Sequence, residues 1–478
     1  MLSRVPCTSF KVISQALDLI GSYADWISSH PEVLGLVLPL MLQGLREPEL
    51  AQSATFSLKE VLQEGQAHLQ PYVADILNAS KEAIDKNNLK ARDTWRLMSC
   101  LGYTLSVVPV DQTMVYLNVL LTPHIQQLQA LSTCQPSSDL KAVLQLKINM
   151  LSWLFNSLSV HYEDDNATTT APQSDEPRQQ PVLLVMQQVL PVIRQVLHTW
   201  VIDPDVVENV CDMMKKAMRT LMDNFRPVVK DVAQLTADMY NSSPQPPMLD
   251  LAKQILVLFV ADESVNDMAV DLFHSVCTKT ISLFQLDVRE YPDIIEAFMA
   301  FLAQIAKKCP KLLGHENCNI LGLFQAGIIG LGMSESPTVK TSCQFLSELI
   351  HGYDNLPAAK AVITTHGLSL VERLMRAIGG ESPRAVVDSM ADVFWALNKW
   401  HLESMVKWMN AVVIQDGFPS AKATRAQKEQ FARRVLKERV NKRRLKETVQ
   451  EFTLLWRGLM GTEYAVQTTS IMEDLGAE

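Results

Sequence analysis

Three residues whose side chains commonly bind metals lie close together in the middle of the chain, at Cys309, His315 and Cys318. Thiolates and imidazoles are the ligands that zinc prefers, and structural zinc sites use four of them. The spacing of these three residues fits no familiar zinc pattern, and a fourth ligand is missing. We therefore interpret the segment as a loop between two helices, and we expect neither a metal nor a cofactor in this protein.

A glycine-rich string, Gly327-Ile-Ile-Gly330-Leu-Gly332, is the nearest approach to a nucleotide-binding motif. Its order differs from that of a dinucleotide fingerprint and no strand precedes it, so we interpret the glycines as places of close helix packing. The chain also lacks a Walker-type phosphate loop, a G-x-S-x-G elbow and an H-E-x-x-H pair. The sequence therefore predicts that the protein is not an enzyme and has no catalytic residue.

Two basic features could bind a partner. Lys307-Lys308 ends a predicted helix just before a Cys-Pro pair, where positive charge either complements the helix dipole or contacts an acidic partner. The segment 422–446 holds eleven Lys or Arg against two Glu. We interpret it as a solvated helix face with an apolar stripe at Leu436 and Val440; a nuclear-localisation-like peptide and an acidic-partner patch are the alternatives.

The helices that would position these lysines follow a regular proline spacing of 43 to 46 residues. Proline suits the first turn of a helix, because its missing N–H would have no partner there. Apolar residues recur two and thirteen positions after each proline, on one helix face. A period of about 40–47 residues is typical of HEAT or armadillo arrays, so the sequence predicts an all-α, right-handed α-solenoid of about ten HEAT repeats, each an antiparallel helix pair. The prolines, three of them after a possible capping residue, are Asp203-Pro204, Pro247, Pro292, Ser336-Pro337 and Ser382-Pro383.

The spacing slips once and so divides the chain. Residues 1–160 hold the first four repeats, the fourth of them partial, and residues 161–180 form an acidic, mobile loop without apolar periodicity. Further repeats occupy residues 181–423, and basic capping helices with a tail occupy residues 424–478. Within this scheme the second helix of the Pro337 repeat is expected at Leu368–Ile378, and Ala426–Leu459 is a final long amphipathic segment.

The composition fits a stacked array. A chain of 478 residues that is 47% hydrophobic exceeds the size of most single cores, and an array avoids that limit. The net charge of −9 favours basic protein partners and disfavours direct binding of nucleic acid. Eight scattered cysteines indicate a reducing compartment. The longest apolar runs are too short to span a bilayer, so we expect a soluble, intracellular protein with no membrane partner.

Five segments carry a resemblance to a known family. They are Ala24–Pro31, Val387–Lys399, Gly417–Ser420, Lys437–Lys446 and Thr453–Leu459. In this order they are similar to the C-terminal half of the importin-13 family of karyopherin-β (importin-β) nuclear transport receptors.

The resemblance implies a function. Receptors of this family carry proteins through nuclear pores under control of the Ran GTPase, and their cargo includes an exon-junction heterodimer that contains Mago. The expected partners are therefore protein cargo and nuclear pore proteins, and the expected locations are cytoplasm and nucleus. The family's cargo lies on a concave surface formed by the second helices of the pairs. Lys307 and Lys308 resemble a basic position of the family that faces cargo, so they are the candidate cargo-binding residues.

The first residues begin almost directly inside a repeat. We therefore expect an exposed apolar face at the first helix, and the family's Ran-binding N-terminal repeats to be missing, so that binding of Ran is weak or lost. The sequence predicts the cargo-binding part of a nuclear transport receptor. The alternative is a HEAT-repeat scaffold subunit of a stable multiprotein complex.

Overall fold

The computed structural model describes residues 9–87, 89–159, 180–286, 288–352 and 356–460. All regular elements in these ranges are helices, which confirms the predicted all-α fold of successive helix pairs. The predicted acidic loop, 161–180, lies outside the described residues except for Gln180. The chain forms two compact units, Met1–Leu235 and Thr236–Glu478.

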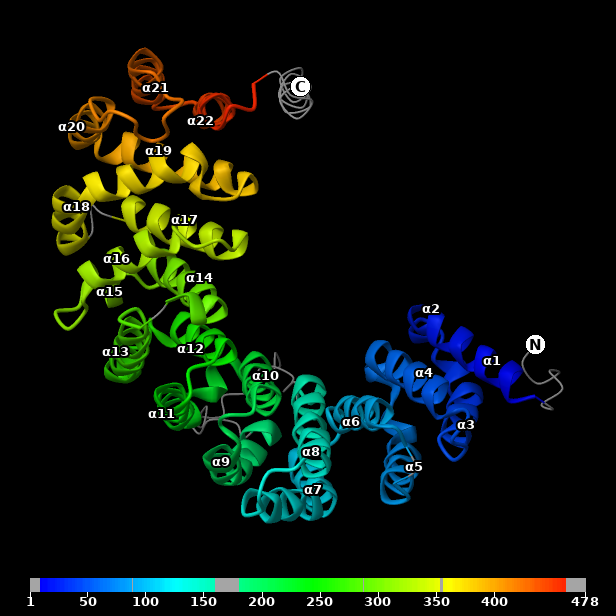
Figure 1. The fold of residues 1–478 in the computed structure, drawn as a ribbon. Coiled ribbons are helices and arrows are strands. Elements are labelled where there is room, and N and C mark those ends of the chain that lie inside the picture. The colour runs from blue at the N-terminus through cyan, green and yellow to red at the C-terminus, as the bar shows by residue number, and fades with distance from the viewer. Residues whose placement is uncertain (1–8, 88, 160–179, 287, 353–355, 461–478) are drawn as a thin grey trace, which may run out of the picture. The chain divides into compact units, whose positions relative to one another are not determined.

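Unit 1 stacks its helices in two rows (Figure 1). Each helix of the first row packs on the next, and the second row covers the same side of the first. The first row consists of α1 (Phe10–Ser22) with its short continuation α2 (Ala24–Ser28), α4 (Ala51–Glu64), α6 (Ala91–Leu105), α8 (Ser138–Ser157) and α10 (Pro204–Leu221). The second row consists of α3 (Leu34–Gly44), α5 (Val73–Asp85), α7 (Val110–Ser132) and α9 (Pro181–Trp200).

Unit 2 repeats the arrangement, and α11 (Arg226–Ser242) contains the boundary between the units. Its first row consists of α12 (Pro246–Phe259), α14 (Pro292–Lys308), α17 (Ser336–His351), α19 (Val387–Trp400) and α22 (Lys442–Arg457). Its second row consists of α13 (Asn266–Leu283), α16 (Ile320–Gly330) after the short α15 (Pro310–Leu313), α18 (Pro357–Arg376), α20 (Leu402–Val413) and α21 (Arg425–Lys437).

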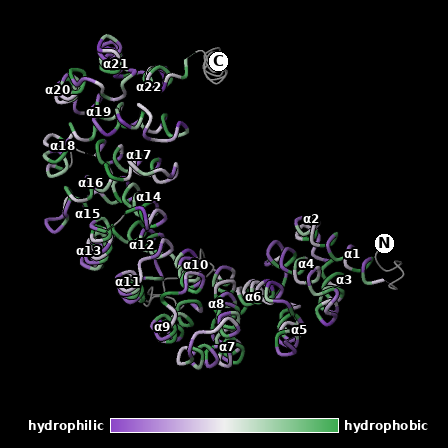
Figure 2. The backbone as a smooth tube through the Cα atoms, viewed as in Figure 1, coloured by the Kyte–Doolittle hydropathy of each residue, from purple (hydrophilic) through white to green (hydrophobic). Residues whose placement is uncertain are grey.

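Burial follows the predicted helix faces. Figure 2 shows each labelled helix as a mixture of hydrophobic and hydrophilic residues, which is the pattern that stacking in rows requires. Of the ten apolar positions set by the prolines, eight are buried, while Val260 is half-buried and Ala385 is exposed. The buried ones are Val206, Ala217, Leu249, Ile294, Ile305, Val339, Ile350 and Ala396.

Four of the five prolines lie in the first turn of a helix, as predicted: Pro204, Pro247, Pro292 and Pro337. Asp203 is the predicted cap, since its carboxylate accepts hydrogen bonds from the N–H groups of Asp205 and Val206 at 3.1 and 3.2 Å. The helix start at Asp203-Pro204 therefore has both of its sequence signals in place.

Two predicted caps are wrong. Ser336 is the first residue of α17 instead of its cap. Ser382 is buried, its hydroxyl donates to the Leu331 carbonyl at 3.2 Å, and the N-cap positions of the turn and helix that follow are Pro383 and Val386 instead. Pro383 accordingly precedes a 3₁₀ turn, and α19 begins only at Val387.

The second helix of the Pro337 repeat starts earlier than predicted. Instead of Leu368–Ile378, α18 spans Pro357–Arg376 and begins with a proline in its first turn. Its first half carries small residues, and at Gly367 the helix approaches α20 so closely that an added Cβ would lie 2.2 Å from the Trp408 ring. This contact needs a small residue, so an apolar-periodicity search misses that half of the helix.

The last pair departs from the alternation of rows. The segment Ala426–Leu459 is two helices, because α21 packs on α20 of the second row and α22 packs on α19 of the first row. The break is fixed by Asn398 of α19, which is fully buried and donates to the carbonyls of Val435 and Glu438, both at 2.9 Å. Asn441 then caps α22, its side chain accepting from the Arg444 N–H at 3.1 Å.

The first helix exposes a face, as expected. Val12, Leu19, Tyr23 and Trp26 lie within a narrow stripe of the α1–α2 wheel, and each is 42 to 55% exposed. Beside the stripe, a largely apolar cavity of about 300 Å³ lies between α1 and α3. The apolar face at the first helix is therefore confirmed.

One described helix, α9, is long and apolar enough to cross a membrane by length and composition, which the sequence reading missed. Half of its apolar window is buried within the structure, and it packs against α7. Both observations are typical of a core helix, and such a match is weak evidence of a membrane span.

A polar contact joins α7 and α8 within unit 1. The Lys147 ammonium donates to Nδ1 of His124 at 2.9 Å, which requires a neutral imidazole because lysine has no acceptor. The pKa of His124 is lowered to about 4, mainly by burial and secondly by the positive charge of Lys147.

This contact predicts a pH dependence. The pKa of His124 in the folded state lies below the value of about 6.5 of an unfolded histidine. The unfolded state therefore binds the proton more tightly than the folded state does. The stability that neutral His124 contributes to the folded state is complete above about pH 6.5 and is lost as the pH falls toward 4. We expect the thermal midpoint to fall less between pH 7 and pH 5 in His124→Gln, whose amide oxygen accepts from Lys147 without titrating. An equal fall in both proteins would contradict the assignment.

The Asn398 contact predicts a loss of stability. Replacement by Ala removes the side-chain donor from both carbonyls; the Val435 carbonyl keeps the Glu438 N–H at 3.2 Å, whereas the Glu438 carbonyl loses its donor, and a buried unsatisfied group costs about 1–3 kcal/mol. We expect Asn398→Ala to lower the thermal midpoint and to speed hydrogen exchange at the start of α22. Asn410→Ala, an exposed change on α20, is the matched control. Equal midpoints for the two variants would show that the contact does not hold the break.

Candidate protein-binding surface

The two candidate lysines lie in the last turn of α14, a first-row helix. Lys307 and Lys308 are both exposed, and neither forms an ion pair with any of the residues that the structure describes. The chain turns directly after them, because Cys309 is buried and its thiol donates to the Leu256 carbonyl at 3.7 Å. The lysines thus project from a rigid corner, where they complement the helix dipole and remain free to bind an anion.

The structure places these lysines on the first helix of their pair. Their helix, α14, packs on α12 and α17 in the first row. A binding surface that uses Lys307 and Lys308 is therefore formed by first-row helices.

Cys309, His315 and Cys318 do not form a common site. Cys309 packs toward α12, whereas His315 and Cys318 line a cavity of about 30 Å³ against α13. Burial raises the pKa of Cys309 and of Cys318 to about 11, which disfavours the thiolate form that a metal binds. Within the described ranges no group of three or more His, Cys, Asp or Glu is placed to hold a metal ion.

The glycine string packs helices closely, as predicted. A Cβ added at Gly327 would lie 2.9 Å from Cδ2 of Leu346, and one at Gly330 would lie 2.2 Å from the Ser342 hydroxyl. Both neighbours belong to α17, so the glycines let α16 approach the adjacent first-row helix. No phosphate site is needed to explain them.

Six of the eleven cations of the basic segment form ion pairs within the fold, and these six share four carboxylates. This pairing favours the interpretation as a structural helix face. The pairs are Arg425–Glu429, Arg433–Glu429, Arg434–Glu451, Lys442–Asp392, Lys446–Asp392 and Arg443–Glu447.

The predicted apolar stripe of this segment is misplaced. Val440 is 93% exposed because it lies in the break between α21 and α22, and Leu436 is only half-buried. The buried face of α21 instead carries Phe431 and Val435. The error follows from reading one continuous helical wheel across the Asn398-capped end.

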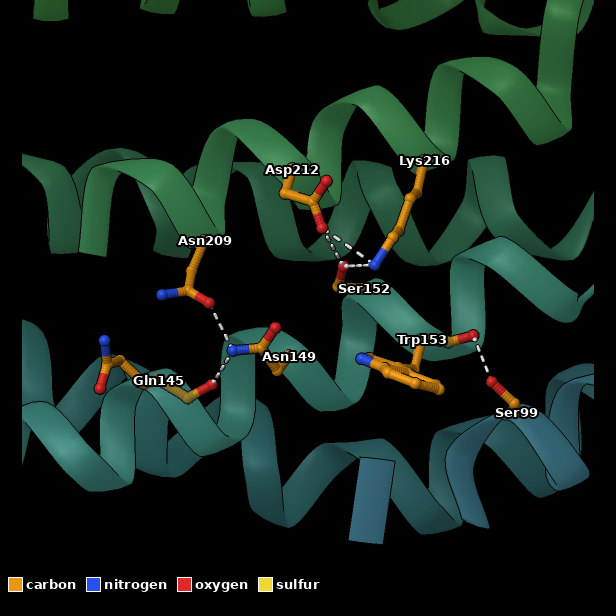
Figure 3. Close-up of polar contacts among 8 residues, drawn as sticks. All are labelled: Ser99, Gln145, Asn149, Ser152, Trp153, Asn209, Asp212 and Lys216. Atoms are coloured by element: carbon orange, nitrogen blue, oxygen red, sulfur yellow. Dashed lines mark hydrogen bonds and ion pairs between the residues drawn. The ribbon is translucent and has the colours of Figure 1, made fainter. Parts of the chain in front are cut away.

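A ladder of polar side chains joins α8 and α10 along the first row of unit 1 (Figure 3). The Asn149 amide donates to Oδ1 of Asn209 and to the Gln145 carbonyl. One turn further along, the Ser152 hydroxyl donates to Asp212 at 3.5 Å and accepts from Lys216 at 3.1 Å.

The ladder reaches α6 through the next residue of α8. Lys216 pairs with Asp212 at 2.9 Å and lies 5.6 Å from the centre of the Trp153 ring. The Trp153 carbonyl in turn accepts from the Ser99 hydroxyl at 3.3 Å. Three successive first-row helices are therefore linked by polar groups, two of whose contacts span the same separation of 60 residues. An alignment of the α8 and α10 sequences at an offset of 60 residues would have placed these polar residues opposite one another.

Three family models match the chain. They are the third TPR domain of transportin-3/importin-13 at residues 5–79, the fourth such domain at residues 180–284, and the importin 13 repeat at residues 331–405. All three name importin-13, and the two TPR-domain models also name transportin-3.

Individual relatives agree with these matches. The chain is 36% identical to importin-13 of Gallus gallus over 97% of its own length and 49% of that protein, and 35% identical to importin-13 of Homo sapiens over 97% and 48%. A solved structure of importin-13 in a cytosolic state superposes with a TM-score of 0.87 at 27% identity, covering 96% of this chain and 51% of that one. Importin-β, at 12% identity and a TM-score of 0.53, shares the fold.

The chain thus spans about half the length of the relatives it matches. Importin-13 proteins are transport receptors and not enzymes, which confirms the expectation of a non-enzymatic chain. The agreement of family models, relatives and fold leads to one assignment. The chain is an importin-13 homologue and belongs to the importin (karyopherin-β) family of helical-repeat proteins.

Proposed function

We propose that the chain is the cargo-binding part of a nuclear transport receptor, which carries proteins through nuclear pores between cytoplasm and nucleus. The observation that carries the proposal is the superposition on importin-13 over 96% of the chain. A receptor of this kind needs a large surface of stacked helices and no catalytic group, and both rows provide such a surface.

Lys307 and Lys308 are the proposed cargo contacts. They are exposed, they form no ion pair among the described residues, and they stand on a chain whose net charge is −9. Unpaired cations on an acidic background attract an acidic patch of a partner and give the encounter its orientation. Their place at the end of α14 holds them without a flexible loop, so little ordering cost opposes binding.

The response to Ran is a separate part of the proposal. The resemblance assigns Ran binding to N-terminal repeats, whereas the matching family models describe the third and fourth domains and a further repeat. We therefore propose that these residues bind cargo and respond weakly or not at all to Ran-GTP. A scaffold subunit would instead hold one constant partner in a stoichiometric complex.

The lysines predict a loss of cargo binding on charge reversal. With the purified Mago-containing heterodimer as ligand, we expect Lys307→Glu combined with Lys308→Glu to weaken binding by roughly ten-fold or more, which corresponds to about 1.4 kcal/mol. The matched control is Lys230→Glu combined with Lys407→Glu, which makes the same charge change at exposed lysines elsewhere. Binding is measured by surface plasmon resonance at two salt concentrations.

The outcomes are distinct. Equal weakening in both double variants would indicate a general charge effect. Unchanged binding would indicate that Lys307 and Lys308 only complement the helix dipole. Addition of Ran-GTP to the preformed complex tests the second part. Full release by Ran-GTP would contradict a weak response, and failure of the wild-type chain to bind any transport cargo while holding one constant partner would favour the scaffold.

A further inference from the structure

A polar pocket lies between α17, α19 and the start of α22 in unit 2. Its volume is about 310 Å³, and its lining includes Lys340, Ser347, Glu348, His351, Asp392 and Lys442. We propose that this pocket receives an acidic side chain, Asp or Glu, of a protein ligand. The inference rests on the proposed function, because it supplies a contact that a bound protein makes on first-row helices.

The charges around the pocket favour an anion. Asp392 is already shared by two cations, with Nζ of Lys442 at 3.2 Å and Nζ of Lys446 at 3.1 Å. Lys340 is exposed at the rim and forms no ion pair with any described residue. Within the lining, Lys340 and Lys442 balance Asp392 and Glu348, and Lys446, which lies outside the lining, offsets Asp392 a second time, so Lys340 is left as the unpaired cation of the pocket.

Aromatic side chains form the wall behind these cations. The Trp395 ring has Nζ of Lys442 5.5 Å and Nζ of Lys399 4.8 Å from its centre, and the His351 ring lies 5.6 Å away. An aromatic wall excludes water on one side of the lysines, so their attraction to a carboxylate is stronger than at a fully hydrated surface.

The Ser347 hydroxyl is a potential hydrogen-bond donor in the pocket. The Ser347 hydroxyl is buried and has no hydrogen-bond partner in the described part of the chain, although the residue lines the cavity. A buried hydroxyl without a partner is costly, and a carboxylate oxygen would satisfy it. Nδ1 of His351 is bound to the Ser347 carbonyl at 2.6 Å, which fixes this wall.

Glu348 fixes the direction in which a charge change should alter ligand binding. Its carboxylate lines the pocket and would repel an acidic ligand, whereas it would attract a basic one. Neutralising Glu348 must therefore strengthen the binding of an acidic ligand, while neutralising Lys340 must weaken it. Opposite effects from two neighbouring neutralisations on one helix cannot come from unfolding.

The experiment titrates the full chain with fluorescein-labelled hexaglutamate and follows fluorescence anisotropy. We expect Lys340→Gln to weaken binding and Glu348→Gln to strengthen it, each by roughly two- to five-fold, as exposed charge pairs do. Ser347→Leu fills the cavity without changing charge and should also weaken binding. Lys407→Gln, an exposed change on α20, is the matched control and should bind as wild type.

Three results would overturn the proposal: hexalysine binding more tightly than hexaglutamate, Glu348→Gln failing to strengthen binding, or Lys407→Gln weakening it as much as Lys340→Gln. The readouts also separate this proposal from transport. If the chain binds the Mago-containing heterodimer but not hexaglutamate, only the proposal of an acid-binding pocket is rejected. If it binds hexaglutamate but no cargo, only the proposed transport function is rejected.

Discussion

A helix pair of this protein buries its apolar face only against the pairs on either side of it, and the rest of the structure depends on that constraint. First-row helices such as α14 and α17 are amphipathic and pack directly on one another, so Phe298, Phe301 and Phe345 become fully buried. Burying a side chain of this size contributes about 1.5–3 kcal/mol. Stability therefore accumulates from neighbour to neighbour, and outward-facing positions are left free for binding.

That constraint explains how much of the fold the sequence predicts. The helix starts at Pro204 and Pro292 follow from a local rule, because proline suits the first turn whatever surrounds it. The first half of α18 is missed because Gly367 fits against Trp408, a contact that calls for a small residue and breaks the apolar pattern. The end of α21 is set by Asn398, which lies 37 residues away from Val435 along the chain.

The candidate site is likewise predicted from the sequence only in part. The exposure of Lys307 and Lys308 follows from their place after the last apolar residue of α14, and the sequence shows that place. The ion pairing of the basic segment 422–446 does not follow from the sequence, because several of its cations pair with carboxylates that lie far along the chain or on another helix, such as Asp392 and Glu451. A polar pocket between three helices and an unpaired Ser347 hydroxyl likewise arise only when the helices meet.

The polar ladder between α8 and α10 has a mechanical consequence. Three of its members, Asn149, Asn209 and Lys216, are partly accessible to solvent, so water can replace their hydrogen bonds as these break, whereas Ser152 is fully buried. An apolar joint such as that between α14 and α17 has no such substitute and resists opening. We therefore expect the joint between α8 and α10 to open at a lower cost in free energy than the joint between α14 and α17.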